Sequence, residues 1–287
     1  MIDRLAIIGV GLIGASLALA LKKAGAVGHV VGCGRSQKNL EKGIELGVID
    51  SYTTSIADAA KNADIVVLAT PLGAMKMAFE QINDSISDQA IVTDAGSAKG
   101  SVIETAKIAL GTKIRQFVPG HPIAGAEKSG VEAGLAGLYQ NRRVILTPIE
   151  STDPAAVKEI EQMWLHCGAS IEYLDVEHHD KVLAATSHLP HMLAYALVNY
   201  LSNLNDHDEI FKYAAGGFRD FTRIASSDPV MWRDVCISNG EALEKFIQGY
   251  KQELDEVSRA IRNRDSDRLL ELFSTAKSER DTLIGNC

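Results

Sequence analysis

A histidine stands inside a rigid turn in the middle of this 287-residue chain. Residues 118 to 130 read V-P-G-H-P-I-A-G-A-E-K-S-G, which puts His121 between Gly120 and Pro122, with an acid, Glu127, close behind. Glycine and proline suit turns for backbone reasons, whereas an imidazole can accept or donate a proton near neutral pH. The stretch follows a predicted strand, so His121 is a candidate general base, with a structural turn histidine as the alternative.

A glycine-rich loop near the N-terminus predicts a dinucleotide site. The hexapeptide G-V-G-L-I-G at 9 to 14 follows an apolar run and opens a helical segment. In that context, backbone N–H groups and the helix dipole can hold a pyrophosphate. A tight strand-to-helix turn without a ligand is the alternative, and the context favours the ligand. The candidate cofactor-binding residues of the loop are Gly9, Gly11, Leu12, Ile13 and Gly14.

The end of the second predicted strand bears on the choice of cofactor. An acidic residue about 20 positions after the glycine loop would bind the adenosine ribose, but Gly34 stands there. Arg35 and Ser36 follow, and a cation with a hydroxyl suits a 2′-phosphate. We therefore expect NADP, with NAD as the alternative if Arg35 only stacks on adenine. Thr70 and Pro71 end a third predicted strand and are expected to run past the cofactor.

The fragment T-D-A-G-S-A-K-G at 93 to 100 follows another predicted strand. Ligands of open parallel sheets bind at the carboxyl ends of strands, so Ser97 and Lys99 could donate hydrogen bonds to a substrate or to nicotinamide. Capping of the next helix by Ser97 or Gly100 is an equally good reading, and it does not exclude the first.

Two arginines in the second half could bind an anion. Arg219 and Arg223 are four residues apart in F-R-D-F-T-R and would share one face of a helix. Such a local cationic pocket is what an acidic protein needs for an acidic substrate. Surface pairing with Asp220 or Asp234 is the alternative.

Three histidines precede these arginines. His179 lies in E-H-H-D, and His188 and His191 lie in S-H-L-P-H. His188 and His191 are three residues apart, a spacing compatible with binding one metal ion. No third ligand stands nearby, however, and Pro190 should distort the helix. We expect no metal site here, and buried structural histidines remain an alternative for all three.

Composition excludes several classes of partner. The net charge is −8, and no basic run is present that could neutralise the phosphates of nucleic acid or an anionic membrane. No segment is apolar enough to span a bilayer. The cysteines lie far apart and form no C-x-x-C pair, so neither a zinc site nor a disulfide framework is indicated, which fits a reducing cytoplasm. The four are Cys33, Cys167, Cys236 and Cys287.

The elements that must position these side chains differ between the two halves. The first half alternates β-rich runs with helical spacing, which predicts an α/β fold with a Rossmann-like, doubly wound and mainly parallel sheet. The predicted strands are 5 to 9, 29 to 33, 64 to 70, 90 to 94, 116 to 120, 143 to 147 and 170 to 174. The predicted helices between them are 12 to 25, 37 to 46, 73 to 82, 100 to 110 and 154 to 166.

Beyond about residue 175 the strand signal disappears. Long helices are predicted over 176 to 203, 229 to 262 and 265 to 284, with Asp228 as an N-cap and Pro229 at the first helical position. We expect a dinucleotide-binding domain at 1 to 174 and an all-helical substrate-binding domain at 175 to 287. Because the helical domain is thin, we expect a second copy to cover it in a homodimer.

Five motifs occur in a distinctive order along the chain. They are G-V-G-L-I-G, D-A-G-S-A-K-G, G-H-P-I-A-G-A-E-K-S-G, T-S-H-L-P-H and G-G-F-R-D-F-T-R-I-A-S-S-D-P-x-x-W. This set resembles the prephenate and arogenate dehydrogenases, the cyclohexadienyl dehydrogenases of tyrosine biosynthesis. The resemblance covers nearly the whole chain, and the later motifs are more specific than the glycine loop.

The resemblance implies a reaction and roles for single residues. Hydride from the ring alcohol of prephenate or arogenate would pass to NAD(P)⁺ while the ring carboxylate leaves as CO₂, giving 4-hydroxyphenylpyruvate or tyrosine. His121 would be the catalytic residue on the ring hydroxyl, Ser97 would contact the same hydroxyl, and Arg223 would bind a substrate carboxylate. Glu127 would help to gate the site through an ionic contact. Residues implied to line the pocket are Arg219, His179, His191 and, less directly, His188.

Two other kinds of protein share part of this pattern. A β-hydroxyacid dehydrogenase normally uses a lysine in its helical domain, and Lys181 and Lys212 lack the glycine-rich surroundings and the following asparagine of that site. A non-catalytic NADP-binding sensor would keep the glycine loop but would have little reason to keep His121 and both arginines.

Overall fold

The computed structural model describes residues 1–125 and 128–283. Six parallel strands form the main sheet in the order β3-β2-β1-β4-β5-β6. Their cores are continuous β-branched and aliphatic runs, such as the fully buried I-V-V-L of β4, because both faces of the sheet are covered. The strands are β1 (Ile2–Ile8), β2 (Val27–Cys33), β3 (Ser51–Thr53), β4 (Ile65–Leu68), β5 (Ile91–Asp94) and β6 (Phe117–Val118).

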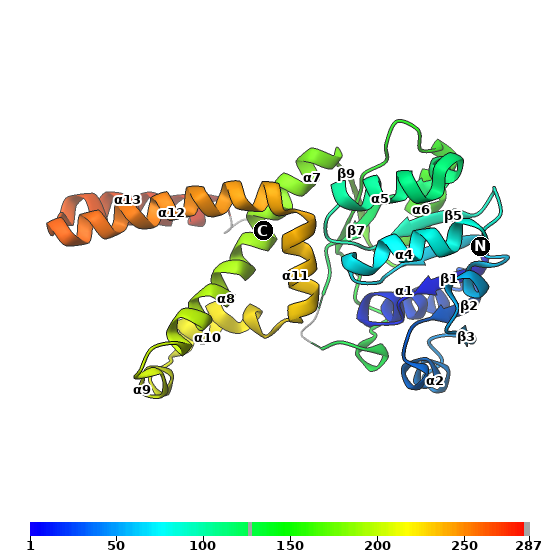
Figure 1. Ribbon diagram of the computed structural model, residues 1–287, viewed down its shortest axis with the longest axis horizontal. Coiled ribbons are helices and arrows are strands. Elements are labelled where there is room, and N and C mark those ends of the chain that lie inside the picture. Colours follow the sequence, from blue (N-terminus) through cyan, green and yellow to red (C-terminus); the bar gives the residue numbers. More distant parts are fainter. Residues whose placement is uncertain (126–127, 284–287) are drawn as a thin grey trace. The chain divides into compact units, whose positions relative to one another are not determined.

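Helices cover both faces of this sheet, as Figure 1 shows. One core joins the sheet to α1 (Leu12–Lys23), α2 (Gln37–Glu45) and α6 (Pro154–His166). A second core joins its other face to α3 (Ile56–Ala60), α4 (Leu72–Asn83) and α5 (Gly100–Leu110). This arrangement confirms the predicted Rossmann-like sheet.

A second, smaller sheet carries His121. It consists of β7 (Gly120–Pro122), which pairs antiparallel with β8 (Arg143–Leu146), and β9 (Ser170–Tyr173), which pairs parallel with β8. The predicted single strand over 116 to 120 was therefore wrong. The chain leaves the main sheet after Val118, since Pro119 between β6 and β7 has no N–H to continue a ladder.

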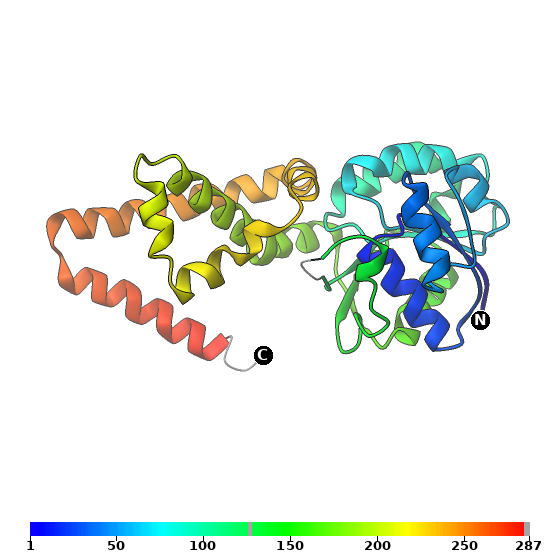
Figure 2. The ribbon, with the colours of Figure 1, turned by 90° about the horizontal axis from the view of Figure 1, so that it is seen from below.

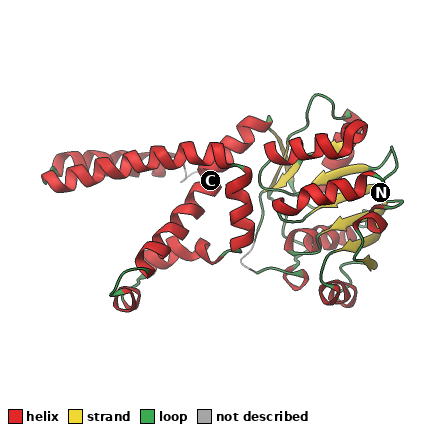
Figure 3. Ribbon diagram, viewed as in Figure 1, coloured by secondary structure: helices red, strands yellow, loops and turns green. Residues whose placement is uncertain are grey.

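The chain after β9 is helical, which Figure 3 shows by the change from strands to helices. Asp228 caps its helix through the N–H groups of Val230 and Met231, as predicted. The α-helices are α7 (Val176–Leu183), α8 (Leu189–Ser202), α9 (His207–Lys212), α10 (Gly216–Thr222) and α11 (Pro229–Ser238). A π-helical segment, Ala184–His188, joins α7 to α8, and a 3-10 segment, Arg223–Ser226, follows α10.

Two predicted continuous helices are therefore interrupted. The span 176 to 203 contains the π segment directly before Pro190, whose ring displaces the ordinary helical hydrogen bond as expected. The span 229 to 262 is broken at Asn239, which caps α11 outside helical geometry.

The described chain divides into two compact units at Gly240 and Glu241. The second contains α12 (Gly240–Asn263) and α13 (Ser266–Leu283), which run antiparallel in Figure 2. Arg264 turns the chain between them with φ of 53°, and Arg268 bonds both Glu256 of α12 and Glu271 of its own helix. No helix in the described ranges has the length and apolar character needed to cross a membrane.

Candidate active site

His121 lies on β7 with 9% of its surface exposed. Its Nδ1 is 2.9 Å from Nε2 of His179, and the two rings meet edge to face. His179 comes from α7, far along the chain, and is completely buried. The imidazole predicted as a base is thus paired on one side with a second imidazole.

The second imidazole is held in turn by a carboxylate. Nδ1 of His179 is 2.8 Å from Oδ1 of Asp180. The carboxylate of Asp180 also accepts the backbone N–H groups of Lys99 and Gly100, each at 2.8 Å, at the start of α5. Burial by itself would raise the pKa of Asp180, but the hydrogen bonds from His179, Lys99 and Gly100 outweigh it and lower that pKa.

These contacts fix the tautomers along the chain of groups. Because ionised Asp180 can only accept, Nδ1 of His179 carries a proton and its neutral ring accepts at Nε2. Nδ1 of His121 must then donate, and Nε2 of His121 is left as a proton acceptor. Burial, followed by His179, Lys99 and His188, lowers the pKa of His121 well below its ordinary value, so the ring stays neutral.

A buried ion pair holds the backbone beside His121. Nζ of Lys99 contacts the Asp94 carboxylate and donates to the carbonyl of Gly120 at 2.7 Å, while Gly120 N–H donates to Asp94 at 3.2 Å. Both side chains are fully buried. The ammonium group of Lys99 therefore donates its hydrogen bonds to Asp94 and Gly120. We had expected it to face a ligand.

The start of α5 also differs from the local capping that we expected. The Ser97 side chain does not cap this helix, and Gly100 is its first residue, so the N-cap residue is Lys99. Asp180 supplies the missing acceptors from α7. Ser97 is half-buried at the connection between β5 and α5. Burial lowers the pKa of the nearby His188 ring to about 4, and the backbone of Ser97 offsets a small part of that lowering.

The remaining predicted histidines lie beside α11. His188 is fully buried at the end of the π segment, whereas His191 is partly exposed and stacks on Trp232 with ring centroids 3.7 Å apart. His191 Nδ1 is 2.8 Å from the carbonyl of Ser187. Both ring nitrogens of His179 are bonded, one to Asp180 and the other to His121.

The two predicted arginines are exposed. They do not share one regular helix, because α10 ends at Thr222 and Arg223 opens the 3-10 segment. Arg223 lies near His191, whose pKa is lowered by burial and then by this guanidinium. Asp234, weighed as an alternative partner, instead bonds Arg233 at 2.6 Å and the N–H of Gly73 at 3.0 Å.

The glycine loop fits the pyrophosphate of a dinucleotide. A Cβ on Gly9 would lie 2.5 Å from the carbonyl oxygen of Ala69, and one on Gly14 would lie 2.3 Å from that of Gly9, so both close approaches require glycine. A Cβ on Gly11 would meet no described atom within 4 Å. No described side chain caps α1 at this point, which leaves its N-terminus open to an anion.

The flanks of the loop are also suited to a polar ligand. Thr70 Oγ1 is buried without a hydrogen-bond partner in the part of the chain described, and Pro71 is the N-cap residue of α4. Arg35 is exposed just after β2, while the hydroxyl of Ser36 accepts the N–H of Asn39 and caps α2.

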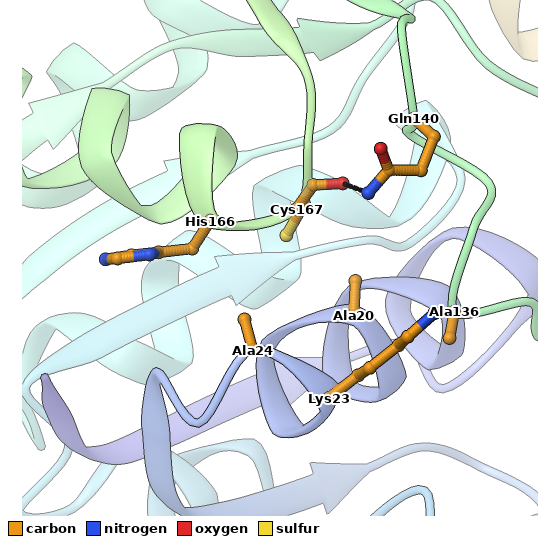
Figure 4. Close-up of a pocket in the computed structure, with 7 residues that line it drawn as sticks. All are labelled: Ala20, Lys23, Ala24, Ala136, Gln140, His166 and Cys167. Atoms are coloured by element: carbon orange, nitrogen blue, oxygen red, sulfur yellow. Dashed lines mark hydrogen bonds between the residues drawn. The ribbon is translucent and has the colours of Figure 1, made fainter.

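Glu127 lies outside the described residues. Among those that are described, no group of three or more His, Cys, Asp or Glu side chains is arranged to hold a metal ion. A cavity of about 180 Å³ lies at the other end of α1 from the glycine loop and shares no residue with the candidate site (Figure 4). It is lined by Ala20, Lys23, Ala24, Ala136, Gln140, His166 and Cys167.

Sequence reasoning missed two polar residues that organise the site, the partly buried Asp180 and the buried Asn239. Asp180 stood in the quoted E-H-H-D, and a carboxylate next to a histidine is a signal that could have been used. Asn239 stands before a glycine, which signals the end of a helix but not a partner for His188.

Comparisons with known proteins agree over both halves. Residues 17–173 match the family model of the prephenate dehydrogenase nucleotide-binding domain, and residues 175–275 match that of the prephenate dehydrogenase dimerization domain. A cyclohexadienyl dehydrogenase of Zymomonas mobilis is 38% identical over 278 residues, which are 96% of this chain and 94% of that protein. A prephenate dehydrogenase of Bacillus subtilis is 36% identical over 99% of this chain and 76% of its own.

Solved structures give the same result. A prephenate dehydrogenase from Aquifex aeolicus, in complex with hydroxyphenyl propionate and NAD⁺, superposes with a TM-score of 0.91 at 38% identity, covering 99% of each chain. An arogenate dehydrogenase from Synechocystis gives a TM-score of 0.79 at 30% identity, covering 97% of this chain and 99% of its own. The chain belongs to the prephenate dehydrogenase family.

Proposed function

We propose that this chain catalyses the oxidative decarboxylation of prephenate, arogenate or both, in tyrosine biosynthesis. The observation that carries the proposal is the bare Nε2 of a neutral His121, held in place by His179 and Asp180. Oxidation of an alcohol needs an acceptor for the hydroxyl proton, and a neutral imidazole is suited to that role. The family to which the chain belongs supports the same reaction.

The proton and the carboxylate of the substrate have separate partners in this proposal. Nε2 of His121 accepts the proton of the ring hydroxyl, and Ser97 binds the same oxygen. A bound nicotinamide would accept the hydride, and the ring carboxylate would leave as CO₂. The electron pair that it leaves behind aromatises the ring, and the resulting phenolate oxygen takes the proton back from Nε2 of His121. Arg223, with Arg219 and His191 beside it, binds a substrate carboxylate. Glu127 is proposed to help to gate the pocket.

The cofactor is a pyridine nucleotide, and we propose NADP in preference to NAD. Gly34 provides no carboxylate to repel a 2′-phosphate, and Arg35 is exposed just after β2. Changing Arg35 to alanine is expected to raise KM for NADP⁺ by about tenfold and to change KM for NAD⁺ little. Equal effects on both would contradict this assignment.

The glycine loop offers a test that separates ligand space from packing. An alanine at Gly11 meets no described atom, so Gly11→Ala should fold normally but weaken binding of the reduced nucleotide, measured by fluorescence titration. Gly217 is equally open in α10, and Gly217→Ala is the matched control. Unchanged affinity in Gly11→Ala would remove the loop from the cofactor site.

A direct assay tests the function itself. The purified chain is mixed with prephenate or arogenate, each with NADP⁺ or NAD⁺, and the absorbance of reduced nicotinamide is followed. We expect reduction with at least one pair, and the pair with the highest kcat/KM identifies the preferred substrate and cofactor. No reduction with any of the four pairs would overturn the proposal.

We also infer two domains and a homodimer. A boundary at 174 and 175 is supported by the two family models, which meet there, and by the passage from β9 directly into α7. Pairing of two copies is supported by the match to a dimerization domain and by large exposed apolar side chains in the second unit. These are Leu254, Ile261, Leu270 and Phe273.

A further inference from the structure

Asn239 is a buried polar residue between α11 and α12 that belongs to none of the motifs discussed above. Only 6% of its surface is exposed. Its Nδ2 donates to the backbone carbonyl of Asp180 at 2.8 Å and lies 3.2 Å from Nδ1 of His188. Because a carbonyl oxygen can only accept, the first bond fixes which end of the amide faces His188.

The orientation of this amide determines the tautomer of His188. Nδ1 faces an N–H donor, so it must be the accepting nitrogen, and the proton of the neutral ring is on Nε2. Burial is the largest cause that lowers the pKa of His188, to about 4, which keeps the ring neutral. His188 therefore presents an N–H at Nε2, whereas His121 presents a lone pair at the same ring position.

The donor of His188 has no well-formed hydrogen bond within the described chain, although the backbone of Ser97 lies beside the ring. Its Nε2 is buried and has no hydrogen-bond partner among the residues described. The ring lies near Ser97 and is close enough to His121 to lower the pKa of that residue. A buried donor without a partner is unfavourable, and such groups are uncommon unless a ligand or a water satisfies them.

We propose that Asn239 is a positioning residue that holds His188 as a neutral donor, whose Nε2–H binds an oxygen atom of the bound substrate. The binding part of the inference rests on the proposed function. The acceptor is a hydroxyl, carbonyl or carboxylate oxygen of a small organic acid. The two imidazoles thus have opposite tautomers and different roles. His121 accepts a proton, and His188 donates a hydrogen bond.

The tautomer is measured in the ligand-free wild-type protein. Long-range ¹H–¹⁵N spectra of ring-labelled histidine distinguish a protonated from a bare ring nitrogen, and His188→Gln identifies the signal of His188. We expect Nδ1 bare and Nε2 protonated at neutral pH. The reverse pattern would overturn the proposal. This measurement requires no turnover, so it stands or falls separately from the proposed activity.

Asn239→Asp tests the link to substrate. The carboxylate can only accept, so Nδ1 of His188 becomes protonated and the Nε2 donor is lost from the neutral ring. We expect the ¹⁵N pattern to change and kcat/KM to fall by about ten- to a hundredfold, mainly through KM, while nucleotide affinity is kept. A changed spectrum with unchanged kcat/KM would overturn the role of His188 in substrate binding.

The matched control is Asn62→Asp. Asn62 is exposed in a turn with φ of 59°, a conformation that both asparagine and aspartate accept. It should leave the His188 signals and kcat/KM unchanged. If Asn239→Asp does not fold, the wild-type spectrum still decides the tautomer, and His188→Gln still reports loss of the ring through KM.

Discussion

At the scale of single residues, the proposed proton acceptor depends on a carboxylate two hydrogen bonds away. Asp180 bonds His179, and His179 bonds Nδ1 of His121. These two bonds determine that Nε2 of His121 carries no proton. The side chains expected to touch substrate and those that orient them are therefore different residues. Substitutions can separate the two roles.

Replacing His121 by asparagine removes the proposed base and keeps a polar side chain on β7. We expect kcat to fall by about 10²- to 10⁴-fold, the usual contribution of general acid–base catalysis, with nucleotide affinity unchanged. Stopped-flow or steady-state rates and a nucleotide titration give the two values. An equal loss of rate and nucleotide affinity would indicate a structural residue.

The pH dependence of activity follows from the direction of the pKa shift. Burial, then His179 and the charges nearby, hold the pKa of His121 well below its usual value, and the residue must be neutral to act as a base. Activity should therefore persist as the pH falls through about 6.5 and decline only at lower pH. The profile of kcat/KM tests this expectation, and an acid limb centred at or above 6.5 would contradict it.

At the scale of elements, α5, α7 and β7 are joined by buried polar groups. Asp180 of α7 accepts from the start of α5, and Lys99 in the same turn bonds Asp94 and the carbonyl of Gly120. The buried ion pair thus determines where β7 lies relative to the main sheet.

Replacing Lys99 by methionine keeps an unbranched chain but leaves Asp94 without its buried cation. We expect the free energy of unfolding to fall by about 3 to 5 kcal/mol. Urea unfolding followed by the fluorescence of the two buried tryptophans, Trp164 and Trp232, measures the change. Lys61→Met, at an exposed position, is the control and should change stability by less than about 0.5 kcal/mol. Equal stabilities for the two variants would contradict this account of the pair.

The sequence predicted the elements whose pattern is local and missed those that tertiary contacts decide. Strands such as β1 and β4 are β-branched runs, and Asp228 with Pro229 marks a helix start on its own. The three residues of β3 are too few to show a period, and were missed. The split at Pro119 depends on pairing with β8, which the local run does not reveal.

The same limit applies to the candidate site. His121, His188, His191 and the glycine loop stand in recognisable motifs. Asp180 stands beside its partner His179 in E-H-H-D, so that contact had a local signal. The contacts of Asn239 with Asp180 and His188 form only when α7 and α11 are brought together. Capping of α5 by a residue from α7 likewise has no local signal, so the local cap was the wrong expectation.

At the scale of the whole molecule, the inferred homodimer gives the apolar side chains of α12 and α13 a partner. We expect Leu270→Glu, combined with Phe273→Glu, to shift the protein from dimer to monomer, because a buried charge without a partner is strongly unfavourable. Sedimentation at micromolar concentration measures the mass. Ile108→Glu, at an exposed apolar position on α5, is the control and should leave the measured mass unchanged. If the double variant remains dimeric, the apolar face of α12 and α13 is not the dimer interface.

The capping of α5 by Asp180 also sets an order of events during synthesis. Asp180 lies 80 residues after the Gly100 N–H that it binds. At roughly 5 to 20 residues per second, a ribosome needs about 4 to 16 s to cover that distance. The glycine loop leaves the ribosome much earlier, so the growing chain contains its nucleotide loop before His121 acquires its partner. The nascent chain therefore has no oriented His121 until α7 has been synthesised.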